Sequence, residues 1–249
     1  MDQPIDLQSR LEFSVIIPVY NEEGAVSALA GEIVSVLAGR SYEMIFVDDG
    51  STDATRETLM SLKASCPGLR ILSHRQNAGQ SRAIRTGVEA ARGRIIGILD
   101  GDGQNDPADL VTLYRHLTGP NAPLDLGLVI GERMQRKDGF RKRVASHLAN
   151  ALRRAVLKDA NQDSGCGLKV LSRALFLRLP YFDHMHRFMP ALVKAEGHSV
   201  EKISVYHRQR EKGQSKYNNI GRAVFGLKDL CGVAWLMKRR RPYGGVDEL

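Results

Sequence analysis

Cysteine is scarce in this sequence, and its three cysteines, at positions 66, 166 and 231, lie far apart. None of them belongs to a C-x-x-C pair. An odd number of isolated cysteines argues against a disulfide framework and against a cysteine-based zinc site. We therefore expect a protein from a reducing compartment.

Long apolar runs are also missing. No uncharged run approaches the roughly 18 residues that suggest a membrane-spanning helix. The first residues, MDQPIDLQSRLEF, lack the basic and then apolar segments of a secretory signal. We expect one main domain, soluble or peripheral to a membrane, because 249 residues that are 43% hydrophobic can bury one good core.

Two common nucleotide-binding motifs are absent. No G-x-G-x-x-G follows the first apolar run, and G-x-x-x-x-G-K-[ST] occurs nowhere. Dinucleotide binding of the Rossmann type and P-loop hydrolysis therefore lose support. If this chain binds phosphates, a metal ion and basic side chains must hold them.

The formal net charge of +8 is unevenly distributed. Residues 1–125 hold 11 basic and 17 acidic side chains, whereas the remainder holds 25 and 11, so the two parts carry net charges of −6 and +14. This asymmetry suggests a metal site in the first part and capture of an anion by the second. A nucleic-acid binder is a more remote alternative, because aromatic residues make up only 6% of the chain and no RNP-like or helix-turn-helix signature is present.

What the sequence does contain is an alternation of short apolar runs and helical segments. The runs at 13–19, 42–48, 69–73, 94–100 and 126–132 predict strands, mostly too continuously apolar to face water. Helices are predicted at 22–37, 53–65, 79–91 and 107–117, with Ser51 and Thr52 as N-cap candidates and Pro107 in a first turn. This order predicts an α/β fold with a mostly parallel sheet covered on both faces.

The second half is less regular. Residues 140–157 predict a basic amphipathic helix, the DSGCGLKVLS segment a turn entering a short strand, and VEKISVYHRQR another strand. Residues 220–237 predict a broadly apolar helix, which is followed by KRRR.

A polar cluster follows each of the first five predicted strands. The clusters are PVYNEE, DDGSTD, RQNAG, DGDGQND and GERMQRK. Ligands of open parallel sheets bind beyond the carboxyl ends of the strands. We therefore expect these five segments to converge on one crevice.

Asp100 and Asp102 are the strongest candidates for chemistry. Two carboxylates separated by Gly101 at a strand end form a hard oxygen site for Mg²⁺ or Mn²⁺ that also bears a diphosphate, and Gln104 offers a further oxygen. The alternative is a turn with capping aspartates before Pro107.

Other acids and an aromatic residue suit a nucleoside. A carboxylate among Asp48, Asp49 and Asp53 can accept hydrogen bonds from a ribose or base, although Asp53 also suits a helix cap. Tyr20 and Glu22 can stack against and bind a base, whereas Asn21 suits the turn. We assign no role to His184 and His186.

Six segments together resemble a known family. VIIPVYNEE, FVDDGSTD, NAG, LDGDGQNDP, DSGCGLKV and RQREKGQSKY are similar, in order, to the signature segments of the family 2 glycosyltransferases of GT-A fold. The similarity is closest to the dolichyl-phosphate mannose synthase type, whose members move a sugar from a nucleotide sugar to a polyprenyl phosphate. It covers residues 13–217, and DGDGQNDP followed by RQREKGQSKY is the part more specific to enzymes acting on lipid phosphates.

The resemblance implies roles for individual residues. It implies a GT-A domain at 12–217 with a basic, amphipathic extension at 218–249, and a metal-dependent, inverting glycosyltransferase. The residues that would bind the nucleoside are Pro18, Tyr20, Glu22, Asp48, Asp49 and Asp100. The metal would be held by Asp100, Asp102 and Gln104, and phosphate handling and catalysis would involve Asp102, Arg133, Arg210 and Lys216. The acceptor phosphate would be bound by Arg141, Lys142 or Arg143. Asp163 would orient a basic residue, bind the acceptor side or form a turn.

The acceptor decides what else the site needs. A hydroxyl acceptor needs a base, but a phosphate monoester, with a second pKa of about 6, is already largely ionised and needs cations instead. The runs ERMQRKDGFRKR and HRQREKGQSK supply them, unless they form a solvated face. A GT-A enzyme acting on a sugar hydroxyl in polysaccharide or lipopolysaccharide synthesis is the alternative, and the residues leave GDP and UDP sugars both open.

The C-terminal helix suggests a membrane surface. Phe225, Leu230, Trp235 and Leu236 offer apolar surface and residues 238–241 are basic, which favours peripheral binding to anionic lipid. The alternative is a core helix packed on the sheet. We expect a cytoplasmic protein, peripheral at the inner face of the cell membrane, with no nucleic-acid partner.

Overall fold

The computed structural model describes residues 11–66, 68–133, 166–206, 208 and 219–239. The strands are β1 Phe13–Val19, β2 Tyr42–Asp48, β3 Leu69–Ser73, β4 Ile95–Ile98, β5 Leu126–Arg133, β6 Lys169–Ser172 and β7 Ser199–Val205. The helices are α1 Val26–Val36, α2 Thr55–Leu62, α3 Gln80–Ala90, α4 Pro107–Thr118, α6 Arg173–Arg178, the 3-10 turn η1 Met185–Arg187, α7 Met189–Ala195 and α8 Asn219–Arg239.

The seven described strands form one sheet in the order β3-β2-β1-β4-β6-β5-β7. Strand β6 pairs antiparallel with both β4 and β5, and the other pairs are parallel. The carboxyl ends of six strands therefore meet at one edge, where β6 begins. The predicted α/β fold with a mostly parallel sheet is confirmed.

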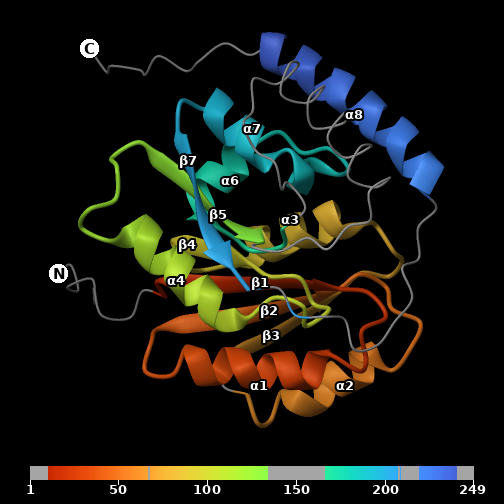
Figure 1. Cartoon of the computed structure of the whole chain (residues 1–249). Helices are drawn as coiled ribbons and strands as arrows, with labels where there is room; N and C mark the ends of the chain where they lie inside the picture. Colours follow the sequence, from red (N-terminus) through yellow and green to blue (C-terminus); the bar gives the residue numbers. More distant parts are fainter. Residues whose placement is uncertain (1–10, 67, 134–165, 207, 209–218, 240–249) are drawn as a thin grey trace, which may run out of the picture.

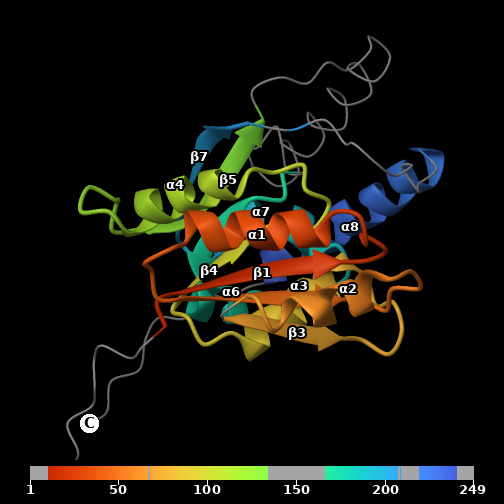
Figure 2. The ribbon, with the colours of Figure 1, turned by 90° about the horizontal axis from the view of Figure 1, so that it is seen from below.

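Helices cover both faces of this sheet (Figure 1). Side chains of α1, α2 and α4 pack on one face, and those of α3, α6, α7 and α8 on the other, in two apolar clusters. All seven residues of β1 are buried, as a parallel strand covered on both sides requires. Figure 2 shows the same layers turned by 90°.

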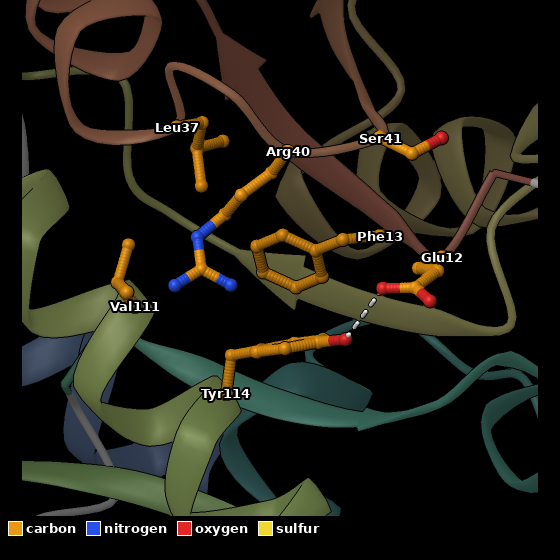
Figure 3. Close-up of a pocket in the computed structure, with 7 residues that line it drawn as sticks. All are labelled: Glu12, Phe13, Leu37, Arg40, Ser41, Val111 and Tyr114. Carbon is orange, nitrogen blue, oxygen red and sulfur yellow. Dashed lines mark hydrogen bonds between the residues drawn. The ribbon is translucent and has the colours of Figure 1, made fainter.

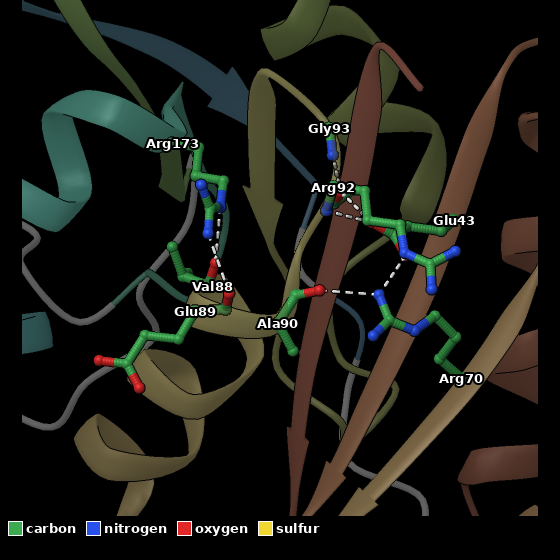
Figure 4. A network of polar contacts seen from close by, with 9 residues as sticks. Glu43, Arg70, Val88, Glu89, Ala90, Arg92, Gly93 and Arg173 are labelled. Atoms are coloured by element: carbon green, nitrogen blue, oxygen red, sulfur yellow. Dashed lines mark hydrogen bonds and ion pairs between the residues drawn. The ribbon is translucent and has the colours of Figure 1, made fainter. Parts of the chain in front are cut away.

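A polar network fixes the edge opposite to the carboxyl ends (Figure 4). The buried carboxylate of Glu43 accepts hydrogen bonds from Ser14 Oγ at 2.7 Å, Arg70 at 2.6 Å and the Arg92 backbone amide at 2.6 Å. Arg70 also donates to the carbonyl oxygen of Ala90. These bonds join β1, β2 and β3 to the end of α3.

Near the same edge lies a small hollow (Figure 3). Arg40 stands 6.0 Å from the ring centroid of Tyr114, whose hydroxyl donates to Glu12 at 3.4 Å. The volume of about 10 Å³ is room for about one water molecule. It is too small for a nucleotide or a sugar.

The predicted N-cap of α2 is wrong. Ser51 Oγ accepts from the Asn21 amide at 3.0 Å and Thr52 Oγ1 from the Asn21 side chain at 3.2 Å, so both hydroxyls serve the loop after β1. Asp53 Oδ1 accepts from the amide of Thr55 instead. Pro107 does lie in the first turn of α4, where Asp106 caps the helix by accepting from Ala108.

In its described side chains, residues 228–239, helix α8 packs on the core by one side. Leu230 and Val233 are buried among side chains of α3, α6 and α7, whereas Trp235 is 61% exposed. His184 Nδ1 lies 3.0 Å from Asp229 Oδ2, which ties the helix to η1. In the described part of the chain, no helix is both long enough and apolar enough to cross a bilayer.

Candidate active site

The loops at the carboxyl ends of β1, β2, β3 and β4 lie against one another. A side chain at Gly101 would meet the carbonyl oxygen of Pro18 at 2.8 Å, and one at Gly50 would meet the amide of Asn77 at 2.7 Å. The amide of Asp49 donates to the carbonyl of Val19 at 2.9 Å. The structure thus brings together four of the five segments that were predicted to converge, and most of the fifth, GERMQRK, lies outside the described residues.

Asp49 organises this edge. Its buried carboxylate accepts from the amides of Ala78 at 2.9 Å and Gly79 at 2.8 Å, while His74 Nδ1 lies 2.6 Å away. The loop from Asn77 to Gly79 is therefore folded around this acid, and α3 starts from the end of that loop.

Asp48 holds the neighbouring turn. Its carboxylate accepts from the amide of Ser51 and from the hydroxyl of Ser73, both at 3.0 Å. Pro18, a predicted nucleoside-binding residue, is buried within β1 and pairs with Val47. Tyr20, just beyond it, is 38% exposed.

The turn after β1 leaves Glu22 beside the start of α2. Its amide donates to Thr55 Oγ1 at 2.8 Å. Asn21 has a positive φ of 54° and its side-chain oxygen accepts from the amide of Thr52 at 2.8 Å. The prediction that Asn21 serves the turn is confirmed.

Asp100 stands just beyond β4 between two neighbours. Gln80, at the start of α3, donates to its Oδ1 at 2.8 Å. The backbone just before β6 passes so close that a side chain at Gly167 would meet Oδ2 at 2.1 Å. Burial raises the pKa of the Asp100 carboxyl, with a further contribution from Asp102, while Lys169 and Arg133 act in the opposite direction.

Asp102 and Gln104 form the next turn of the acidic loop, which we define as residues 100–106. The amide of Gln104 donates to Asp102 Oδ1 at 3.2 Å. Gly103 has φ of 72°, a conformation that glycine adopts without strain. Asp102 and Gln104 are both half-buried.

Two cations act on this acidic end of the sheet. Arg133 is the last residue of β5, and Lys169, the first of β6, is buried with its ammonium group donating to the carbonyl of Cys166. Both lower the pKa of Asp100, so both charges stand near its carboxylate. The prediction that Arg133 faces phosphates stays a prediction.

His184 and His186 bind side chains of the fold. His186 Nδ1 lies 2.8 Å from Ser81 Oγ, and shielding from water together with Lys169, Arg187 and His184 lowers its pKa to about 3. His184 faces Asp229. Neither belongs to a group of three or more His, Cys, Asp or Glu side chains suited to a metal, because the described residues contain no such group.

Several predicted site residues lie outside the described residues. These are Arg141, Lys142, Arg143, Asp163, Arg210 and Lys216, together with the predicted helix at 140–157.

Sequence reasoning missed three residues that the structure places at or beside the acidic end. Gln80 follows the NAG segment, Lys169 lies in the GLKV segment, and Arg208 belongs to the basic run that also contains Arg210. Arg208 donates to Glu32 and Asp106, so it is held by carboxylates. The GLKV segment by itself gives no sign that Lys169 lies near Asp100, because that contact depends on the antiparallel pairing of β6 with β4.

The donor set fits a divalent cation that shares its coordination with a ligand. Asp100 and Asp102 are close enough for each charge to act on the other, and Gln104 is adjacent. Two carboxylates and an amide are hard oxygen donors of the kind that Mg²⁺ and Mn²⁺ accept. They leave positions that diphosphate oxygens would fill.

Comparison with known proteins points to one class, the glycosyltransferases. The model of the family described as glycosyl transferase family 2 matches residues 14–179. The chain is 35% identical over 239 residues to the dodecaprenyl-phosphate galacturonate synthase of Rhizobium johnstonii, covering 93% of this chain and 69% of that protein. It is 32% identical to the undecaprenyl-phosphate 4-deoxy-4-formamido-L-arabinose transferase of Edwardsiella ictaluri, covering 82% of this chain and 62% of that one.

Solved structures share the fold. The mannosyl-3-phosphoglycerate synthase of Rubrobacter xylanophilus aligns with a TM-score of 0.69 at 16% identity, covering 94% of this chain and 77% of that one. The glucosyl-3-phosphoglycerate synthase of Mycobacterium tuberculosis, crystallised with Mn²⁺, UDP-glucose and glycerol 3-phosphate, aligns with a TM-score of 0.64 at 22% identity, covering 89% and 80%. The sheet order and acidic loop described above thus belong to a GT-A fold, and the chain is a glycosyltransferase of family 2.

Proposed function

We propose that this enzyme transfers a sugar from a nucleotide sugar to a polyprenyl phosphate, with inversion at the anomeric carbon, at a membrane surface. The observation that carries the proposal is the position of Asp100 and Asp102 just beyond β4, beside the loops that follow β1 and β2. The two relatives reported above, both named as polyprenyl-phosphate sugar transferases or synthases, support the acceptor class.

The donor nucleoside would bind beside the loops after β1 and β2. Tyr20 offers an exposed ring for stacking and Glu22 a carboxylate for a polar edge. Asp48 and Asp49 would support this site indirectly, because their carboxylates accept hydrogen bonds from backbone amides of the DDGSTD and NAG segments. Pro18 would lie beneath the nucleoside, near the end of β1.

Asp102, Asp100 and Gln104 would hold Mg²⁺ or Mn²⁺, which supplies positive charge to the departing diphosphate. Asp102 lies nearest to the diphosphate in this proposal, because Asp100 is already held by Gln80 and packed on Gly167. Arg133 adds a cation from the end of β5. Arg210 and Lys216 add two more from the segment after β7.

The transfer step then needs no base. An oxygen of the acceptor phosphate forms a bond to the anomeric carbon from the side opposite the leaving group. The bond between that carbon and the β-phosphate oxygen breaks, and its electron pair stays on the nucleoside diphosphate. No proton is removed, because a phosphate monoester is largely ionised at neutral pH. Arg141, Lys142 or Arg143 would bind the acceptor phosphate, and Asp163 would orient a basic side chain.

Helix α8 supports a location at the membrane. Trp235 is exposed, and the side chains of Lys238 and Arg239 are exposed beside it. A hollow of about 290 Å³ lies between the end of α8 and helices α6 and α7, lined mostly by apolar side chains with Arg178 and Arg239 among them. Apolar surface beside cations suits a peripheral helix on anionic lipid.

The deciding experiment offers the purified enzyme Mg²⁺ or Mn²⁺, a panel of GDP and UDP sugars, and a polyprenyl phosphate. A glycolipid extracted into chloroform is the expected product. Phosphate-free prenol and a sugar-hydroxyl acceptor serve as controls. If sugar moved equally well to either control, the enzyme would act on hydroxyl groups and the proposal would be wrong.

A further inference from the structure

Arg208, just beyond β7, joins three separate parts of the chain. One nitrogen of its guanidinium donates to both carboxylate oxygens of Glu32 in α1, at 2.9 and 2.8 Å. The other donates to Oδ2 of Asp106 at 2.9 Å. Glu32 and Asp106 are 74 positions apart in sequence, so this one side chain links α1 to the end of the acidic loop.

The backbone around Arg208 makes a second set of bonds to the same loop. The amide of Arg208 donates to the carbonyl of Gln104 at 2.8 Å, and the amide of Tyr206 donates to Asp109 at 3.1 Å. Gln104 in turn donates its own amide to Asp102 at 3.2 Å. A short chain of hydrogen bonds therefore runs from Arg208 to the carboxylate of Asp102.

The surroundings of Asp106 explain why the Arg208 guanidinium is needed at the end of the acidic loop. Its Oδ1 already caps α4 by accepting from Ala108, and its Oδ2 accepts from Arg208. Glu32, Asp106 and Asp109 bring three acids to this place, and burial and Asp106 raise the pKa of Asp109. Without a cation, repulsion among these acids would push the loop away from α1.

We propose that Arg208 is a positioning residue for the acidic loop: it fixes the loop between α1 and the end of β7 so that Asp102 is held where metal and diphosphate bind. The inference rests on the proposed function, since it concerns the metal site of that reaction. It gives Arg208 a different part from Arg210 and Lys216, the two residues of the same run to which we assign phosphate contacts.

The chemistry of the side chain sets the expected pattern. A guanidinium presents a planar fork that can bind two carboxylates at once, whereas an ammonium is a point charge on a flexible stem. Arg208→Lys should therefore keep the charge but restore only part of the positioning. Arg208→Gln should lose both.

The test measures metal-dependent nucleotide binding by calorimetry, with UDP and GDP in separate titrations, each with and without Mn²⁺. Arg208→Gln should weaken binding in Mn²⁺ about tenfold and leave the metal-free binding unchanged, because a partly exposed, charge-assisted network is being removed. Arg208→Lys should fall between it and the wild type. Arg115→Gln, an exposed arginine of α4, is the matched control and should bind like the wild type.

Glu32→Gln separates positioning from direct phosphate binding. If Arg208 acts through the loop, losing its partner on α1 should weaken Mn²⁺-dependent binding too, and the double variant should be no weaker than Arg208→Gln alone. If Arg208 bound phosphate itself, Glu32→Gln would free the cation and leave binding unchanged or tighter, which would overturn the inference. Wild-type binding by Arg208→Gln would overturn it as well.

Two further outcomes are distinguishable. A wild-type enzyme that binds neither nucleotide with Mn²⁺ would contradict the proposed function, and the inference with it. If Arg208→Gln did not fold, as judged by circular dichroism, Arg208→Lys and Glu32→Gln would decide the question, and unchanged binding in both would reject positioning.

Discussion

Asp102 is the residue on which the proposed chemistry depends most. Both Asp102 and Asp100 are half-buried, but Asp102 accepts from the Gln104 amide, whereas Asp100 is packed on Gly167 and bonded to Gln80. Two acids two positions apart therefore have different surroundings. In the proposed reaction Asp102, which lacks the contacts with Gln80 and Gly167, is the one that shares a metal ion with a substrate.

Replacing Asp102 by asparagine should lower turnover at least a hundredfold without unfolding the protein, because one of the charged metal ligands becomes neutral. Initial rates at saturating Mn²⁺, together with circular dichroism spectra, check this. Asp125→Asn, at an exposed position outside the crevice, is the control. Wild-type turnover in Asp102→Asn, or in the wild type with excess chelator, would contradict the metal assignment.

The surroundings of Glu43 predict how the stability of the fold depends on pH. Burial alone would raise the pKa of its carboxyl, but the bonds from Arg70, the Arg92 amide and Ser14 lower it below the ordinary value of 4.5. A lowered folded pKa means that folding favours the ionised form. The stabilisation is therefore present above about pH 4.5 and is lost as the pH falls through the folded pKa.

Glu43→Gln should accordingly reduce the free energy of unfolding at pH 7 by about 2 kcal/mol, as expected for the loss of a charged hydrogen-bond acceptor. Below pH 4.5 the difference between variant and wild type should shrink. Urea unfolding at several pH values measures both. Glu57→Gln, at an exposed site in α2, should show neither effect, and a constant difference at all pH values would refute the role of ionisation.

At the scale of elements, the sequence predicts strands better than short helices. The predicted bounds of β1, β2 and β3 agree with the structure because a continuous apolar run between polar clusters has few alternatives. The helices α6 and α7 and the turn η1 were not predicted. They have six, seven and three residues, too few for a helical period to stand out, and tertiary packing defines them.

Pairing between strands explains what the sequence could not reveal at the site. The acidic loop was found because its carboxylates lie close together in the chain. Lys169 and Arg208 act on acids far away in sequence, and their partners depend on the antiparallel register of β6 and on the end of β7. A single sequence carries no record of such register.

Helix α8 has features of both interpretations of its sequence, a core helix and a helix at a membrane surface. The face with Leu230 and Val233 belongs to the core, as the alternative reading expected, while Trp235 lies on an exposed face. The side chain of Phe225 lies outside the described residues. Docking to the core and contact with a membrane therefore do not compete for the same face.

The enzyme should sediment with anionic liposomes at low salt and dissociate as salt rises, because screening weakens attraction between cations and lipid. Replacing residues 238–241 with glutamine should reduce binding, since each cation contributes about 1 kcal/mol near the surface. Arg56→Gln with Lys63→Gln, exposed at α2 on the opposite face of the sheet, is the matched control. No binding at any salt, with full activity on vesicle-borne acceptor, would assign lipid contact to another surface.

At the scale of the whole molecule, charge is divided between two parts of the chain. The first 125 residues carry a net charge of −6 and contribute the acidic end of the sheet, while the remainder carries +14. A metal-bound nucleotide sugar suits the first part. An anionic acceptor at an anionic surface suits the second.

Arg210→Ala and Lys216→Ala should each raise the KM for polyprenyl phosphate or lower kcat by about tenfold, because charge-assisted bonds to phosphate are lost. Steady-state kinetics with varied acceptor measure this, and Arg115→Ala on α4 is the control. Neither variant should improve the use of phosphate-free prenol. Equal rates with prenol and prenyl phosphate would contradict the role of these cations.

The direction of β6 has a consequence for how such an enzyme can change. Because β6 runs against its neighbours, β5 ends and β6 begins at the same edge of the sheet, and the register of the pair is fixed by Leu128 with Leu171 and Ile130 with Lys169. The connection between them, which includes residues 141–143, therefore starts and finishes at one edge of the sheet. The entropy of closing a loop grows only slowly with its length, by about 0.6 kcal/mol for each doubling. Changes in the length of this connection should therefore cost little stability and leave the paired strands in place, and in the proposed reaction such changes would fall on the acceptor side.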